Sequence, residues 1–326
     1  QEILIMGRKN FFSLLGLAVF ILVFPVVRYS ASFSHYVDIM VFVGLIGMIT
    51  MGLSLLMGYA GQISLGHAAF FGLGAYVSGI MTTKVGLNPW LAILAGIALS
   101  TVIAIFIGTP SLKLKGHYLA MATLGFGEII YIVFNEWISL THGPDGFGGI
   151  PRLAVFGFTF STTLHYYYLI WGLIILTLAF NLNVIHSRIG RALMSIHGSE
   201  VAAKAMGVNA ANFKIQVFIL SAVLASVAGS LYAHYVQFIN PPVFSLFFSI
   251  KLVMMVVIGG MTSVWGALLG AAILTFLPEW LVFLQEIDIL AYGAILLLIT
   301  MFLNQGLISL PRVLFSLVTS RAGRKG

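Results

Sequence analysis

The chain consists mostly of apolar runs that are each about as long as a helix crossing a lipid bilayer. The hydrocarbon core of a bilayer is about 30 Å thick, and a helix needs roughly 20 apolar residues to cross it. About ten such runs can be delimited: 11–28, 36–57, 66–83, 90–109, 117–138, 165–183, 213–235, 245–258, 265–284 and 289–309. Charged residues make up only 8% of the chain, against roughly a quarter in soluble domains, whose surface faces water. The sequence therefore predicts an all-α polytopic membrane protein with about ten transmembrane helices, formed as a single domain over residues 1–326.

The positions of Lys and Arg predict how these helices are oriented. An even number of spans places both termini on one side, and Lys and Arg are enriched in cytoplasmic loops. With the N-terminus inside, about twelve of the sixteen lie at the cytoplasmic side: Arg8, Lys9, Lys113, Lys115, Arg188, Arg191, Lys204, Lys214, Arg312, Arg321, Arg324 and Lys325. Both termini and segment 184–212 are therefore expected in the cytoplasm, and segment 139–164 outside. Because the basic residues sit in short loops rather than in one stripe, the net charge of +7 does not indicate a nucleic-acid partner.

Sequence motifs for catalysis are missing from the chain. The phosphate-binding loop G-x-x-x-x-G-K-[ST] is absent, because the dipeptide Gly-Lys never occurs. Neither H-E-x-x-H nor G-x-S-x-G occurs, and there is no cysteine. We therefore expect a protein that is not an enzyme, with no metal and no cofactor of its own. A pump of this kind would need an external motor.

A polar, glycine-rich stretch interrupts the apolar sequence at Gly58–His67. Non-helical backbone at membrane depth must be buried in protein or line water. Gln62, Ser64 and His67 could then face a polar path, and the alternative is a cytoplasmic turn with a polar cap. Glu128 lies near the middle of the fifth apolar run, where a carboxylate costs several kcal/mol unless it is paired, protonated or hydrated. These four residues are the candidates for a translocation path, and a structural hydrogen bond is the alternative for Glu128.

Three local patterns predict packing and turns. Small residues at every fourth position let helices approach closely in lipid. They recur at Ala92, Gly96, Ser100, Ala104 and Gly108, and again at Ser221, Ala225, Gly229 and Ala233. The Gly259-Gly260 step between runs 245–258 and 265–284 fits either a tight turn or a broken, re-entrant segment. Within 184–212, Ala202–Met206 favour a short helix, and Gly207 favours its C-terminal stop.

Four segments in this order resemble one family. They are Gly58–Ala75 (GYAGQISLGHAAFFGLGA), Gly116–Ile130 (GHYLAMATLGFGEII), Leu140–Arg152 (LTHGPDGFGGIPR) and Arg188–Asn209. Together they are similar to the M-type permease subunit of bacterial branched-chain amino-acid (Liv-type) ABC transporters, over about residues 36–310. The resemblance implies a multi-pass protein of the bacterial plasma (inner) membrane.

The resemblance also implies partners and site residues. The partners would be a second permease, two cytoplasmic ATP-binding subunits that hold ATP and Mg, and an extracytoplasmic substrate-binding protein. The inner loop would dock on an ATP-binding subunit through Glu200, Ala203, Met206, Gly207 and Asn209. The outer loop, with Thr141, Gly143, Asp145 and Gly146, would face the binding protein or cover the entrance. His142 departs from the small residue that commonly follows the Thr in such permeases.

The sequence leaves other functions open. Urea and short-chain amide permeases share the same pattern, so the resemblance does not fix the substrate. A proton- or sodium-coupled secondary transporter using Glu128 is less favoured, because such proteins show several polar sites near the midplane and internal repeats. A membrane scaffold or enzyme anchor is the third possibility, and it does not predict dense glycine-polar interruptions.

Overall fold

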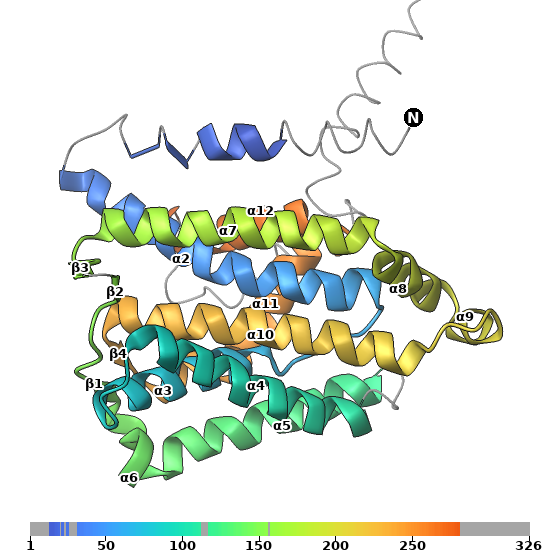
Figure 1. Ribbon diagram of the computed structural model, residues 1–326, viewed down its shortest axis with the longest axis horizontal. Coiled ribbons are helices and arrows are strands. Elements are labelled where there is room, and N and C mark those ends of the chain that lie inside the picture. The colour runs from blue at the N-terminus through green and yellow to red at the C-terminus, as the bar shows by residue number, and fades with distance from the viewer. Residues whose placement is uncertain are drawn as a thin grey trace, which may run out of the picture.

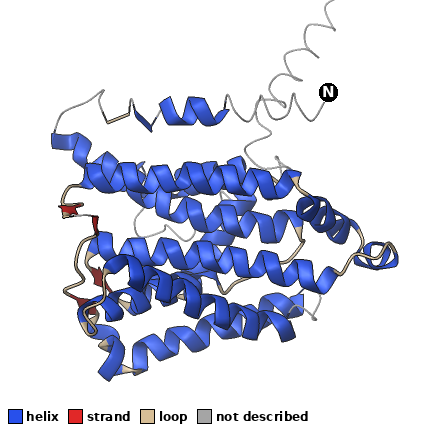
Figure 2. Cartoon of the chain, in the orientation of Figure 1, coloured by secondary structure: helices blue, strands red, loops and turns tan. Residues whose placement is uncertain are grey.

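The computed structural model describes residues 13–19, 21–22, 24–25, 31–111, 117–155 and 157–280. Nearly all of the regular structure in this part of the chain is helical (Figure 2). The long helices are α2 (Ala31–Ser54), α3 (His67–Thr83), α4 (Pro89–Ser111), α5 (His117–Glu136), α7 (Thr163–His186), α10 (Ala210–Val236), α11 (Leu246–Gly259) and α12 (Val264–Trp280). Shorter elements are the π-helical turn η1 (Leu55–Tyr59), helices α6 (Ile138–Thr141), α8 (Arg188–Gly198) and α9 (Glu200–Ala205), and the 3-10 turns η2 (Gly143–Asp145) and η3 (Pro241–Phe244).

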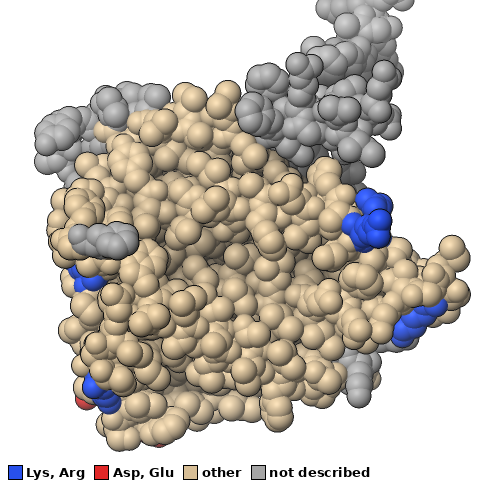
Figure 3. All heavy atoms as spheres, in the orientation of Figure 1, with Lys and Arg blue, Asp and Glu red and all other residues tan. Residues whose placement is uncertain are grey.

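The long helices run side by side, and the two ends of the bundle differ (Figure 1). At one end lie two small antiparallel pairs, β1 (Phe147–Gly148) with β4 (Phe238–Ile239), and β2 (Ala154–Val155) with β3 (Phe158–Thr159). Helices α8 and α9 project from the other end. On the face shown in Figure 3, Lys and Arg lie near the two ends and none lies in the wide band between them. This arrangement is that of a bundle whose middle faces lipid.

Among the described residues, five helices are long and apolar enough to cross a membrane: His35–Tyr59, Pro89–Ser111, Tyr118–Glu136, Thr163–His186 and Ala210–Val236. Each matches a predicted run. The predicted run 289–309 lies wholly outside the described residues and run 11–28 lies partly outside them, so the count of about ten spans and the cytoplasmic termini stay predictions.

Helices α11 and α12 form an antiparallel hairpin joined by a tight turn at Gly260–Ser263. Their backbones touch: a Cβ at Gly259 would lie 1.9 Å from the carbonyl oxygen of Gly266. The Ser54 and Tyr59 hydroxyls donate to carbonyl groups of the turn, at 2.9 and 2.7 Å. Of the two predictions for the double glycine, the tight turn is confirmed. At 14 residues, α11 is about 21 Å long, which is shorter than a full crossing.

The two stripes of small residues pack helices together, as predicted. Every residue of the α4 stripe and of the α10 stripe is buried, and α10 packs against both α3 and α4. A Cβ at Gly229 would lie 1.8 Å from the carbonyl oxygen of Phe71, and one at Gly74 would lie 2.0 Å from that of Ser226. The backbones of α3 and α10 are therefore in direct contact. In a lipid environment such contact replaces the hydrophobic drive that associates helices in water.

Candidate functional site

The α8–α9 segment is built by local signals that the sequence carries. The Ser199 hydroxyl caps the start of α9 by accepting from the amide of Ala202 at 3.3 Å. At the other end Gly207 adopts φ +82°, and its amide donates to the carbonyl of Lys204 at 3.0 Å. The amide of Val208 donates to the carbonyl of Ala203, also at 3.0 Å. These paired bonds form a Schellman motif, so the predicted short helix and its glycine stop are confirmed.

Helix α9 presents one face inward and one outward. Ala203 is only 3% exposed and packs with Ile196 and Ala210 in a small apolar cluster. Val201 and Met206 are 73% and 85% exposed. Of the residues predicted for coupling, Met206 is therefore free to touch a partner, whereas Ala203 holds α9 against the bundle. Val201 is a second exposed apolar residue on this helix.

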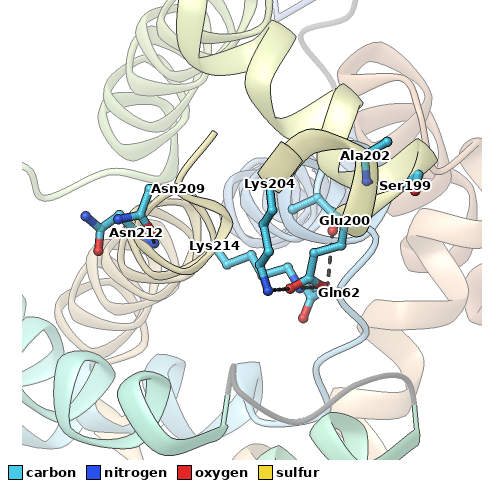
Figure 4. Close-up of polar contacts among 9 residues, drawn as sticks. Gln62, Ser199, Glu200, Ala202, Lys204, Asn209, Asn212 and Lys214 are labelled. Atoms are coloured by element: carbon cyan, nitrogen blue, oxygen red, sulfur yellow. Dashed lines mark hydrogen bonds and ion pairs between the residues drawn. The ribbon is translucent and has the colours of Figure 1, made fainter. Parts of the chain in front are cut away.

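A pair of lysines fixes Glu200 at the base of this segment (Figure 4). One carboxylate oxygen lies 2.9 Å from Nζ of Lys204, and the other lies 2.7 Å from Nζ of Lys214. Hydrogen bonds from Lys204 and Lys214 lower the pKa of the Glu200 carboxyl to about 2. The Lys214 side chain is 3% exposed, although the sequence placed it at the cytoplasmic end of the predicted run 213–235 and indicated no partner for it. Asn209 caps α10 by accepting from the amide of Asn212 at 3.2 Å.

The polar stretch between η1 and α3 is a non-helical loop in which Gly61 and Ile63 are exposed. Gln62 and Ser64 are both buried, and the Gln62 amide donates to the carbonyls of Ala60 and Gly61 at 3.3 Å. The Gln62 Oε1 oxygen has no partner among the described residues. The Ser64 hydroxyl accepts from the amide two residues on, at 3.4 Å. The burial of Gln62 and Ser64 fits non-helical backbone enclosed by protein. The loop also lies against α8, since a Cβ at Gly61 would lie 3.4 Å from the ring of His197. Both the polar path and the polar-capped turn at the cytoplasmic side therefore stay predictions.

His67 lies inside the bundle, at the start of α3. Its Nε2 lies 2.6 Å from the Ser221 hydroxyl on α10, and its ring packs edge-on against Phe70 and Phe218. The Nδ1 atom is buried and has no partner among the described residues. His67 therefore connects α3 to α10 at the point where their small-residue contact begins.

Glu128 faces away from the rest of the described chain. The buried face of α5 consists of Leu119, Thr123, Phe126 and Phe134. Glu128 lies nine residues after Leu119, about two and a half helical turns, and so on the opposite side. No described residue forms a hydrogen bond or ion pair with its partly exposed carboxylate. The neighbouring Gly125 has open space where a side chain would be.

The outer loop is folded against the end of α10. Thr141 is buried, and its hydroxyl donates to the carbonyls of Phe134 and Trp137 at 2.8 and 2.9 Å. Gly143 and Gly146 are also buried, and Asp145 is exposed. Gly146 has φ +79°, and a Cβ there would lie 2.3 Å from the ring of Phe238. This pairing with β4 could not be predicted from local sequence patterns, because β4 is about ninety residues further along the chain.

The structure keeps the predicted groups apart rather than forming one site. The α8–α9 segment lies at one end of the bundle and the outer loop at the other (Figure 1). The described residues contain no group of three or more His, Cys, Asp or Glu that could hold a metal ion.

Apolar helices that lie side by side, with charged residues near the two ends of the bundle, define a multi-pass α-helical membrane protein. The chain belongs to the family described as "Branched-chain amino acid transport system / permease component", whose family model matches residues 35–304. Its place is the inner membrane.

Individual relatives agree with this assignment. The high-affinity branched-chain amino acid transport system permease protein LivM of Salmonella typhimurium is 29% identical, over 83% of this chain and 69% of the relative. LivH of Escherichia coli is 25% identical, over 82% of this chain and 92% of the relative. The probable LivM of Methanocaldococcus jannaschii is 23% identical, over 71% of this chain and 77% of the relative. No solved structure matches.

Proposed function

We propose that the chain is the permease subunit of a binding-protein-dependent ABC importer for branched-chain, hydrophobic amino acids. The family assignment and the names of the relatives support this proposal. The complex would contain a second, homologous permease, two cytoplasmic ATP-binding subunits and an external binding protein. ATP and Mg would be held by the ATP-binding subunits, since this chain has no phosphate-binding loop.

The observation that carries the proposal is the exposed apolar tip of α9. Val201 and Met206 are exposed on a helix that is capped at both ends and held to the bundle by the ion pairs of Glu200. A short helix presenting apolar residues is suited to insert into a groove on a soluble partner. The rigid base lets a displacement of that partner reach α10, and through α10 the bundle. Asn209 contributes by fixing the first turn of α10.

The proposed translocation path involves Glu128 and the second permease. A carboxylate on an outer helix face is costly against lipid, so we place the α5 face against the partner permease or against water in the path between them. Gln62, Ser64 and His67 would support the path from within the bundle by fixing the α2–α3 loop and the α3–α10 contact.

Substituting Met206 with Glu in the full complex tests the coupling assignment. A charge on the tip should abolish docking, because burying a Met side chain contributes about 1.5–3 kcal/mol and a buried unpaired charge opposes it. We expect co-purification of the ATP-binding subunit and ATP-driven leucine uptake to fall at least tenfold. Phe158→Glu, which alters an exposed apolar residue at the opposite end of the bundle, should leave co-purification of the ATP-binding subunit unchanged. Normal uptake by Met206→Glu would rule out this docking site.

Two uptake comparisons separate the proposal from its alternatives. Labelled urea taken up in place of leucine would assign the chain to urea or amide transport. Glu128→Leu should reduce uptake much more than Glu128→Gln if the residue lines the path as a polar group. Equal damage from both variants, with a steep pH dependence, would instead indicate an ion-coupled mechanism.

A further inference from the structure

A cavity of about 290 Å³ opens between α2 and α12. Its lining residues are His35, Asp38, Ile39, Phe42, Ile46, Thr275 and Glu279. Between Val37 and Ala60 the central helix α2 is buried at every position except Asp38, Phe42 and Ile46. These three residues are spaced four apart and therefore form one stripe along the helix. The stripe runs from a charged end to an apolar end.

The charged end of the cavity has a surplus of negative charge. The His35 imidazole lies 2.9 Å from one oxygen of Glu279, and the hydroxyl of Tyr235 donates to one oxygen of Asp38. No described residue bonds the second oxygen of either carboxylate. With two carboxylates and one imidazole, the net charge is negative whether or not His35 is protonated. Thr275 adds a buried hydroxyl that has no partner among the described residues.

The cavity lies toward the end of the bundle where the outer loop folds. Tyr235, which bonds Asp38, is in the last turn of α10, directly before β4, and β4 pairs with β1 of that loop. In the proposed orientation this is the side from which a binding protein would deliver substrate. The apolar end, at Phe42 and Ile46, lies further along α2.

We propose that this cavity binds a zwitterionic amino acid with an apolar side chain during its entry into the permease. The ammonium group would lie between Asp38 and Glu279 and supply the missing positive charge. The substrate carboxylate would accept from Thr275 and His35, and the side chain would pack on Ile39, Phe42 and Ile46. At about 290 Å³ the cavity is at the small end of ligand pockets, which suits a single amino acid.

The proposal deepens, and rests on, the proposed amino-acid permease function. It also discriminates among substrates. Urea is neutral and has no apolar group, so it satisfies neither end of the cavity. A carboxylic acid that lacks the ammonium group, such as 4-methylpentanoate, would be repelled by the two carboxylates.

The test is equilibrium binding of labelled leucine to the detergent-solubilised transporter complex, without the binding protein. Asp38→Asn and Glu279→Gln should each weaken leucine binding at least tenfold. Glu136→Gln, which removes an exposed carboxylate at the C-terminal end of α5 and outside the cavity, should change leucine binding less than twofold. Unlabelled leucine should displace the label, whereas 4-methylpentanoate and urea should not. Wild-type affinity in both cavity variants, or displacement by urea, would overturn the proposal.

A second variant keeps the test independent of the charged pairs, whose loss could disturb folding. Ile46→Phe narrows the apolar end without altering any charge. It should reduce leucine binding more than alanine binding, and equal retention of both amino acids would contradict the placement of the side chain. Leucine uptake separates this proposal from the proposed function. If the cavity variants transport leucine like the wild type, only the cavity proposal fails. A wild-type complex that imports no leucine would refute the proposed function itself.

Discussion

Replacing Glu200 with Gln should loosen α9 from the bundle. The substitution keeps the size of the side chain and removes its charge, so the ammonium group of Lys214 stays buried with no counter-charge. Lys204 is 57% exposed and can turn to solvent, but Lys214 at 3% exposure cannot. Of the two lysines that share the Glu200 carboxylate, only Lys214 depends on it to compensate its charge, because Lys204 can be solvated by water instead.

The size of the effect follows from this difference in burial. Breaking a buried ion pair by removing one partner costs about 3–5 kcal/mol, because the remaining charge is uncompensated. Glu200 is itself 22% exposed, so water can partly solvate the site, and we take the lower end, about 3 kcal/mol. The exposed i,i+4 pair with Lys204 contributes only about 0.3–0.5 kcal/mol. Since about 1.4 kcal/mol is a factor of ten, Glu200→Gln should increase local opening of α9 roughly hundredfold.

Thiol labelling of Ala203→Cys measures this opening. The chain has no cysteine, so the introduced thiol is unique, and its buried position makes labelling depend on local opening. We expect Glu200→Gln to raise the labelling rate roughly hundredfold and Lys204→Met to raise it about twofold. The double variant Glu200→Gln with Lys214→Met should label slowly again, because both buried charges are gone.

Two results would refute this reasoning. If Lys204→Met raised the labelling rate as much as Glu200→Gln, the exposed pair rather than the buried one would hold α9. If Glu200→Gln had no effect, the Ile196–Ala203–Ala210 cluster and the two caps would suffice to hold the helix.

The remaining predictions concern pH, packing and topology. The folded-state pKa of Glu200 lies below its ordinary value of 4.5, so the stabilisation by its ion pairs is present above pH 4.5 and is lost as the pH falls to about 2. The α9 amides should therefore exchange hydrogen faster as the pH falls through that window. Unchanged exchange would contradict the ion-pair account. Gly229→Ala should lower the melting temperature of the purified protein by the equivalent of about 1–3 kcal/mol, because the added Cβ meets the backbone of α3. Gly172→Ala, whose added Cβ meets open space, should leave the melting temperature unchanged. Equal melting temperatures for the two variants would mean that α3 and α10 can separate without cost. Ser199→Cys should label only from the cytoplasm and Ser161→Cys only from outside, and the reverse pattern would invert the proposed orientation.

The sequence by itself determined the elements whose causes are local. A run of about twenty apolar residues forms a membrane helix because a helix satisfies its backbone hydrogen bonds within the run itself. The stripe through Gly229 predicted a close helix contact, and Ser199 and Gly207 mark the ends of α9, because caps depend on neighbours a few residues away. These features need no knowledge of which helices meet.

Only the tertiary structure decided which side chains meet across the fold. The residues His35 and Glu279 are 244 positions apart and share one cavity. Lys214 has the sequence context of a lysine at the cytoplasmic end of a membrane helix, and its ion pair depends on α9 folding back onto α10. Glu128 has the sequence context of a core acid, but the choice of neighbours for α5 turns it outward. Helix periodicity fixes which residues share a face, whereas the partner of that face depends on the packing of every other helix, and a local pattern carries no record of it.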